Sequence, residues 1–78
     1  MIQYYFDIVI DDEVCVDEEG LLLPDLERAK REASLSLAEI ARDRLRSTRS
    51  ISRLSIVVRT IDGPISEAFV QWDPRSLH

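Results

Sequence analysis

The sequence predicts an α+β domain in which four antiparallel strands form one sheet and one long helix covers one of its faces. Three observations support this fold class. Residues 2–10 place an aromatic or β-branched side chain at every even position, which is the period of a strand. Residues 24–46 carry an apolar stripe at helical spacing and contain no glycine. Two further strand-like runs, 53–61 and 65–72, follow, so the predicted element order is β-β-α-β-β.

The first two strands are expected to form a hairpin. The even-numbered side chains of 2–10 face the core, and the Asp-Asp pair at 11–12 supplies the turn because aspartate satisfies local backbone groups. The short second strand, 13–17, then points Val14 and Val16 toward the core. A glycine shortly after this strand permits a sharp change of direction.

The helix is predicted over residues 24–46. Pro24 suits the first helical position, where an N–H would have no intrahelical partner. Asp25 and Glu27 place negative charge at the positive end of the helix dipole. At about 100° per residue, five apolar side chains fall on one stripe that must pack against the sheet. These side chains are Leu26, Ala29, Ala33, Leu37 and Ile40.

The last two strands are expected to form a second hairpin. In 53–61 alternate residues are branched and apolar, and the Asp-Gly-Pro run at 62–64 predicts a turn. The pattern of 65–72 is ambiguous, since apolar residues occur on both of its faces. We expect a single domain over residues 1–78, in which the helix covers one face of the sheet. The expected order across the sheet is 13–17, 2–10, 53–61, 65–72.

The residue inventory argues against an enzyme. The chain has one histidine, one cysteine and two glycines, so zinc-ligand spacing, an activated nucleophile and a glycine-rich phosphate loop are all missing from the sequence. His78 is expected to lie in a loose tail, and Cys15 is expected to be a structural thiol within a strand. We therefore expect no catalytic residue, no metal-ligand set and no cofactor.

Charge is unevenly distributed along the chain. Residues 1–19 hold seven acidic and no basic residues, whereas residues 42–59 hold six arginines and one aspartate. One alternative is that Asp17, Glu18 and Glu19 bind a divalent metal or a small cationic ligand. Another is nucleic-acid binding by the arginines within 42–53, which the net charge of −5 and the lack of interleaved aromatic residues disfavour. These arginines are Arg42, Arg44, Arg46, Arg49 and Arg53.

The compartment expected from the sequence is the cytoplasm. A single cysteine suits a reducing environment. The opening residues carry neither a basic leader nor an apolar run long enough for a signal peptide or a membrane span. We therefore expect a soluble protein without a membrane partner.

Apolar residues outside the predicted core indicate a partner surface, because a chain this small gains stability by burial against a partner. We expect a non-enzymatic interaction or regulatory module that forms a homodimer or docks to another protein. The alternative is a monomer with scattered exposed apolar residues. The expected contact residues are Tyr5, Val9, Val57 and Phe69 on the uncovered face of the sheet, and Leu35 and Leu45 on the outer side of the helix. Cys15 and the charged Asp7 and Arg59 are expected on the same uncovered face.

Four short motifs give the chain a resemblance to a known family. Tyr-Tyr-Phe-Asp at 4–7, Asp-Glu-Glu-Gly at 17–20, Leu-Pro-Asp at 23–25 and Asp-Gly at 62–63 follow one another along nearly the whole chain. In these motifs the sequence resembles a family of small bacterial proteins classed only as a domain of unknown function. The resemblance implies a small α+β domain and brings with it no established activity, cofactor or catalytic residue.

Overall fold

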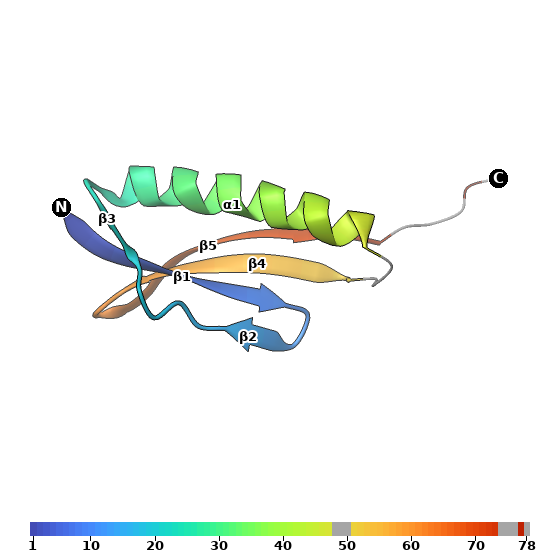
Figure 1. Cartoon of the computed structure of the whole chain (residues 1–78), viewed down its shortest axis with the longest axis horizontal. Coiled ribbons are helices and arrows are strands. Elements are labelled where there is room, and N and C mark those ends of the chain that lie inside the picture. The colour runs from blue at the N-terminus through green and yellow to red at the C-terminus, as the bar shows by residue number, and fades with distance from the viewer. Residues whose placement is uncertain (48–50, 74–76, 78) are drawn as a thin grey trace.

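The computed structural model describes residues 1–47, 51–73 and 77, and these contain one helix and five strands. In chain order the elements are β1 (Ile2–Ile10), β2 (Glu13–Cys15), β3 (Leu21–Leu23), α1 (Leu26–Arg46), β4 (Arg53–Thr60) and β5 (Gly63–Gln71). The described strand pairs are all antiparallel, and α1 lies across one face of the sheet (Figure 1). The predicted α+β class, with one long helix packed on an antiparallel sheet, is confirmed.

The sheet differs from the predicted one in detail. Its path β2-β1-β4-β5 follows the expected order, but β3 pairs with β1 as a fifth strand. β2 pairs with residues 8–10 of β1, and β3 pairs with residues 2–4. At about 3.3 Å per residue, β1 is long enough for two three-residue strands to pair with its two ends. The sequence did not indicate β3 because three residues are too few for a periodic signal.

The first hairpin corrects the predicted orientation of two side chains. Only residues 11–12 separate β1 from β2, and the first of them has a φ of 51°. This short connection aligns Val9 with Val14, and it aligns Ile8 with Cys15. Aligned residues of neighbouring strands point to the same side of a sheet, and Ile8 packs toward the helix. Cys15 therefore lies on the helix side and Val14 on the opposite side, so both predicted orientations are wrong.

The helix begins two residues later than predicted. Asp25 is its N-cap, with an extended backbone and a carboxylate that accepts a hydrogen bond from the Arg28 N–H at 2.9 Å. Pro24 therefore precedes the helix and does not occupy its first position. The last turn carries Arg44 and Arg46, whose positive charges suit the negative end of the helix dipole. Within the described residues, no helix combines the length and apolar character needed to cross a membrane.

The core lies between α1 and the sheet. Its buried cluster is Tyr4, Ala29, Ala33, Ile56 and Val58, each at most 2% exposed. The two alanines have small side chains, so the N-terminal half of the helix can lie close to the sheet. The remaining members of the predicted stripe pack against this cluster, and the stripe is confirmed. They are Leu26, Leu37 and Ile40.

Two features explain the ambiguous pattern of the last strand. The register of β4 against β5 shifts between Val58 and Arg59, which leaves Ile65 as an extra residue on β5. Beyond this bulge the alternation is regular, and Phe69 is an exposed apolar residue on the face opposite to Ala68. The strand also begins earlier than predicted, at Gly63, because the turn consists of residues 61–62 alone.

Candidate functional site

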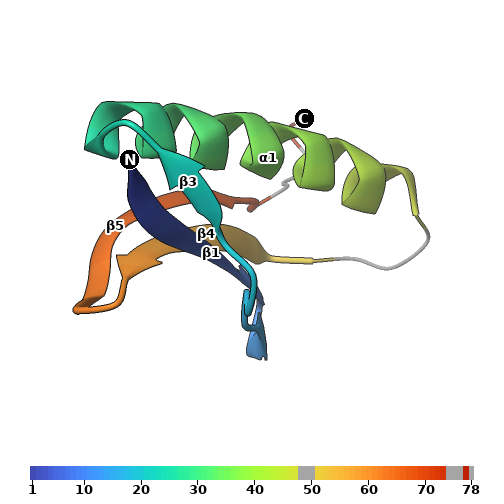
Figure 2. The ribbon, with the colours of Figure 1, turned by 60° about the vertical axis from the view of Figure 1, so that its left-hand side comes forward.

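The candidate site is the face of the sheet opposite α1, called the open face below. α1 is the single helix within 1–47, 51–73 and 77, and it lies on the other side of the sheet (Figure 2). Alternate side chains of three long strands build the open face, and the strand registers fix which of them are neighbours. They are Tyr5, Asp7 and Val9 on β1, Arg53, Ser55, Val57 and Arg59 on β4, and Glu67 and Phe69 on β5.

A row of four side chains crosses the open face from one edge strand to the other. Val9 is aligned with Val14 on one side and with Ser55 on the other, and Ser55 is aligned with Phe69. The end residues are exposed, Val14 to 62% and Phe69 to 56%. Ser55 is buried, and its hydroxyl has no hydrogen-bond partner among the residues described. These four residues are called the central row.

Charged residues flank the central row. Arg53 lies on one side of it, while Asp7, Val57 and Glu67 form the next row on the other side. The Arg53 side chain extends across the central row. Its guanidinium carbon lies 4.5 Å from the Phe69 ring centroid, and its Nη2 is 3.4 Å from Glu67 Oε1. Both charged side chains of this pair remain more than a third exposed, so the pair contributes little to stability.

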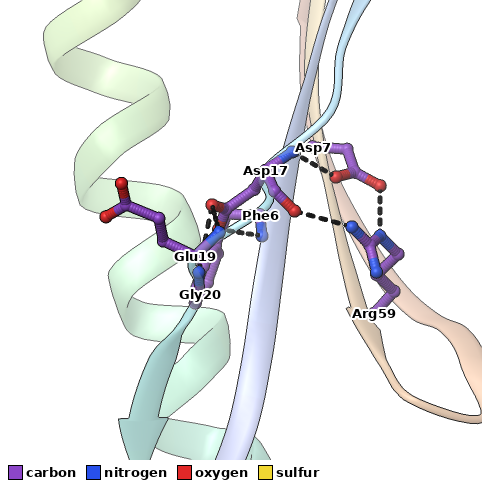
Figure 3. Close-up of polar contacts among 6 residues, drawn as sticks. All are labelled: Phe6, Asp7, Asp17, Glu19, Gly20 and Arg59. Atoms are coloured by element: carbon purple, nitrogen blue, oxygen red, sulfur yellow. Dashed lines mark hydrogen bonds and ion pairs between the residues drawn. The ribbon is translucent and has the colours of Figure 1, made fainter.

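Arg59 joins three separate segments beside these rows. Its Nε donates to Asp7 Oδ2 at 2.7 Å, and its Nη2 donates to the Asp17 carbonyl oxygen at 2.7 Å (Figure 3). Its guanidinium carbon lies 4.4 Å from the centroid of the Tyr5 ring. The hydrogen bond to the Asp7 carboxylate raises the pKa of Arg59, which keeps the guanidinium charged. These four residues are called the Arg59 clasp.

Asp17 fixes the connector between β2 and β3. Its carboxylate accepts backbone N–H groups from Phe6 at 3.0 Å, Glu19 at 3.0 Å and Gly20 at 3.1 Å. Burial raises the pKa of Asp17, but the three N–H donors and the neighbouring guanidinium outweigh it, so this pKa lies below its ordinary value of 3.8. If β2 continued along β1, the Phe6 N–H would donate to a backbone carbonyl of β2. It donates to the Asp17 carboxylate instead. β2 therefore ends at residue 15, and not at residue 17 as predicted.

Gly20 is required by the same connector. Its φ is +72°, and a Cβ at this position would lie 2.6 Å from the Tyr4 carbonyl oxygen and 2.8 Å from Gln3 Nε2. The same Gln3 nitrogen donates to the Glu19 carbonyl oxygen at 2.6 Å. The Asp-Glu-Glu-Gly motif at 17–20 is therefore a structural connector held against β1.

The acidic residues that the sequence offers as metal ligands are not gathered at one point. The Asp17 carboxylate is directed at backbone N–H groups, while Glu18 and Glu19 are exposed. In the part of the chain that the structure describes, no group of three or more His, Cys, Asp or Glu side chains is arranged to hold a metal ion.

A hollow of about 360 Å³ lies beside this connector. It is lined by Phe6, Ile8, Cys15 and Val16 and by the acidic residues 17–19. Val16, predicted to point into the core, is 56% exposed here. Cys15 is a free, exposed thiol in this hollow.

The described arginines of residues 42–53 lie on two different sides of the sheet. Arg42 and Arg46 are exposed on α1, whereas Arg53 lies on the open face, on the other side of the sheet. Arg49 lies outside the described residues, and so does His78.

The six residues predicted to form a partner surface fall on two separate surfaces. The open face brings together Tyr5, Val9, Val57 and Phe69, while α1 carries Leu35 and Leu45, each 58% exposed. Sequence reasoning placed Asp7 and Arg59 on this face without pairing them, and it missed the structural role of Asp17. The opposite charges of Asp7 and Arg59 on the same face of two predicted strands were the available signal for their ion pair.

Comparison with known proteins identifies the family. Searches of the curated proteins and of the solved structures returned no significant match. A scan against protein-family models matches residues 3–69 to a family described as a domain of unknown function (DUF6894). The matched range runs from β1 through the Asp17 connector and α1 into β5, and it covers most of the chain. The chain therefore belongs to the DUF6894 family.

Proposed function

We propose that this chain is a non-enzymatic protein-interaction module that self-associates through the open face of its sheet. The observation that carries the proposal is the central row, in which exposed Val14 and Phe69 lie on the face opposite the helix. An antiparallel sheet tolerates a solvated face when that face is polar. Three of the four side chains of this row are apolar, and apolar side chains on an otherwise solvated face favour its burial against a second surface.

The small core supports the same proposal. Six apolar residues of the described chain are buried, and two of them are alanines. A domain of this length has little apolar area to bury, so contact with a partner is an effective source of further stability. At about 25 cal/mol per Å², burying about 60 Å² of a partly exposed phenylalanine would contribute about 1.5 kcal/mol. The six buried apolar residues are Tyr4, Ala29, Ala33, Leu54, Ile56 and Val58.

The Arg59 clasp supports a binding role over a catalytic one. A general acid or base needs a free proton-transfer position facing a substrate. Here the Asp7 carboxylate accepts hydrogen bonds from Arg59 Nε and the Asp17 N–H, and the Asp17 carboxylate accepts three from backbone N–H groups of β1 and the connector. These contacts hold the side chains of the face in fixed positions, and such preorganisation lowers the entropy cost of docking.

The two alternatives have less support. Metal or cation binding at the acidic stretch would require Asp17 to give up three backbone donors. Nucleic-acid binding would require a continuous basic surface, whereas Arg53 and the helix arginines lie on different sides of the sheet.

Analytical ultracentrifugation of two matched variants tests the proposal. Phe69 is 56% exposed on the open face and Leu35 is 58% exposed on the outer side of α1, so substituting either by serine removes a similar apolar surface. We expect the wild type to dimerise, Phe69→Ser to dimerise at least tenfold more weakly, and Leu35→Ser to match the wild type. A wild type that stays monomeric up to about 500 µM contradicts self-association. A dimer weakened by Leu35→Ser alone contradicts the choice of surface.

A further inference from the structure

We infer that the open face receives a second copy of this chain, related by a two-fold axis that runs along the central row. The inference rests on the proposed function and deepens it by assigning the symmetry of the contact. Two identical sheets that pack face to face are related by a two-fold axis lying between them. The strand registers allow two simple directions for this axis, along the strands or along the central row.

An axis along the strands places like charges together. With this axis over β4, the middle one of the three long strands, Arg53 of one copy lies over Arg53 of the other, because β4 lies on β4 and positions along the strand are kept. The two sides of the sheet exchange, so that Asp7 on β1 lies over Glu67 on β5. Both contacts are repulsive, and like charges facing one another across an interface disfavour it.

An axis along the central row gives the opposite result. Each residue of the row then faces its own counterpart, so Val9 lies over Val9 and Phe69 over Phe69. The rotation places the row that contains Arg53 in one copy over the row that contains Asp7, Val57 and Glu67 in the other. Arg53 then lies over Val57 of the other copy, and Glu67 of that copy is next to Val57 on the neighbouring strand. Val9 and Phe69 meet their own apolar counterparts, Ser55 meets Ser55, and Arg53 lies diagonally across from Glu67 twice by symmetry. Asp7, which is already paired with Arg59, lies over position 11 of the other copy.

The existing Arg53 contact allows this exchange. Within one copy the Arg53–Glu67 pair is 3.4 Å long, and its side chains are 37% and 43% exposed. Such an exposed pair contributes little, so replacing it with the same pair between copies costs little. Moving the guanidinium off the Phe69 ring also frees that ring for the partner. The charges thus select the orientation while the central row supplies the apolar contact.

The size of the face sets the expected affinity. The three long strands β1, β4 and β5 are about eight residues each, and β2 has three. At about 4.8 Å between strands and about 3.3 Å per residue they cover about 430 Å² in each copy. A total of about 850 Å² is below the usual size of specific, stable interfaces and fits a weak contact. We therefore expect a dissociation constant of about 1–100 µM.

Charge-reversal variants mixed in pairs test the inference. Arg53→Glu alone and Glu67→Arg alone each place like charges opposite one another in a row-axis homodimer. Mixed in equal amounts they restore both cation–anion contacts, so we expect heterodimers at least tenfold more stable than either homodimer. Native mass spectrometry separates the species because the two variants differ in mass. Lys30→Glu mixed with Glu27→Lys reverses a surface pair on α1 and serves as the control, for which we expect statistical mixing.

A second mixture distinguishes the two axes. Arg53→Glu mixed with the wild type favours the heterodimer only if Arg53 faces Arg53, and the row axis predicts no such preference. A preference in this mixture, or statistical mixing of Arg53→Glu with Glu67→Arg while the wild type dimerises, overturns the inference and leaves the proposed function standing. A wild type that does not dimerise overturns both.

Discussion

Arg59 Nε donates to Asp7 Oδ2 at 2.7 Å, although the two residues lie 52 positions apart in the chain. The pair sits where β1 and β4 run side by side in the middle of the sheet. The same guanidinium bonds the carbonyl oxygen of Asp17, so one side chain ties both strands to the connector that leads to the helix. The contact is therefore a structural link between the two halves of the chain, and it orders the open face.

Replacing Arg59 should loosen this link. Arg59→Met removes the cation and leaves the Asp7 carboxylate, 13% exposed, without its charged partner. We expect the melting temperature to fall by about 5 °C or more in thermal denaturation. Arg59→Lys should not restore the melting temperature, because one ammonium group cannot reproduce the guanidinium hydrogen bonds to both the Asp7 carboxylate and the Asp17 carbonyl oxygen. Arg31→Met, on the exposed side of α1, is the control and should leave the melting temperature unchanged.

Asp17 variants should show how much its side-chain hydrogen bonds contribute to the free energy of unfolding. Asp17→Ala removes the side-chain hydrogen bonds to the Phe6 N–H of β1 and to the two N–H groups of the connector, and we expect a loss of about 2 kcal/mol in the free energy of unfolding. Asp17→Asn keeps one carbonyl oxygen and should lose about half as much. Urea denaturation measures both values. Glu18→Ala, an exposed neighbour, should be neutral, and an Asp17→Ala variant as stable as that control would contradict the assigned role.

The lowered pKa of Asp17 predicts acid sensitivity. The folded carboxylate has a pKa below 3.8, so in the acid range the unfolded chain binds more protons than the folded one. The stabilisation is fully present above about pH 5 and is lost as the pH falls through the lowered folded pKa. We expect the free energy of unfolding to fall less steeply with acidification in Asp17→Asn than in the wild type. Equal slopes below about pH 4 would show that Asp17 is not involved.

The two glycines should respond differently to alanine. Gly20 has a φ of +72° and its Cβ would clash with the Tyr4 carbonyl oxygen, whereas Gly63 has a φ of +121° and no atom within 4 Å of a Cβ among those described. Gly63→Ala carries backbone strain alone, and Gly20→Ala carries strain together with a steric clash. We expect losses of about 1 and about 3 kcal/mol respectively in urea denaturation. Equal losses would show that the connector moves freely away from β1.

The sequence was sufficient for the parts of the fold that depend on periodicity. The helical stripe from Leu26 to Ile40 and the even positions of β1 repeat often enough to indicate both buried faces. The orientation of Val14 and Cys15 was predicted wrongly because that strand was assigned from its own apolar residues. A two-residue turn at 11–12 fixes the register instead, and it places Val14 beside Val9.

The candidate site depends on contacts that no local pattern contains. Pairing Asp7 with Arg59 requires the register between β1 and β4, which are separated by the whole helix. The role of Asp17 requires the connector to fold back onto the Phe6 N–H, and three acidic residues in a row indicate only a solvated loop. The central row likewise appears only when three strand registers are combined.

Sedimentation equilibrium of the wild type and of Phe69→Ser, from about 5 to 500 µM, tests the central claim most directly. The account predicts a wild-type mass that rises from monomer to dimer with concentration, and a Phe69→Ser curve displaced to at least tenfold higher concentration. A constant monomer mass for the wild type, or coincident curves for the two proteins, would contradict self-association through the open face.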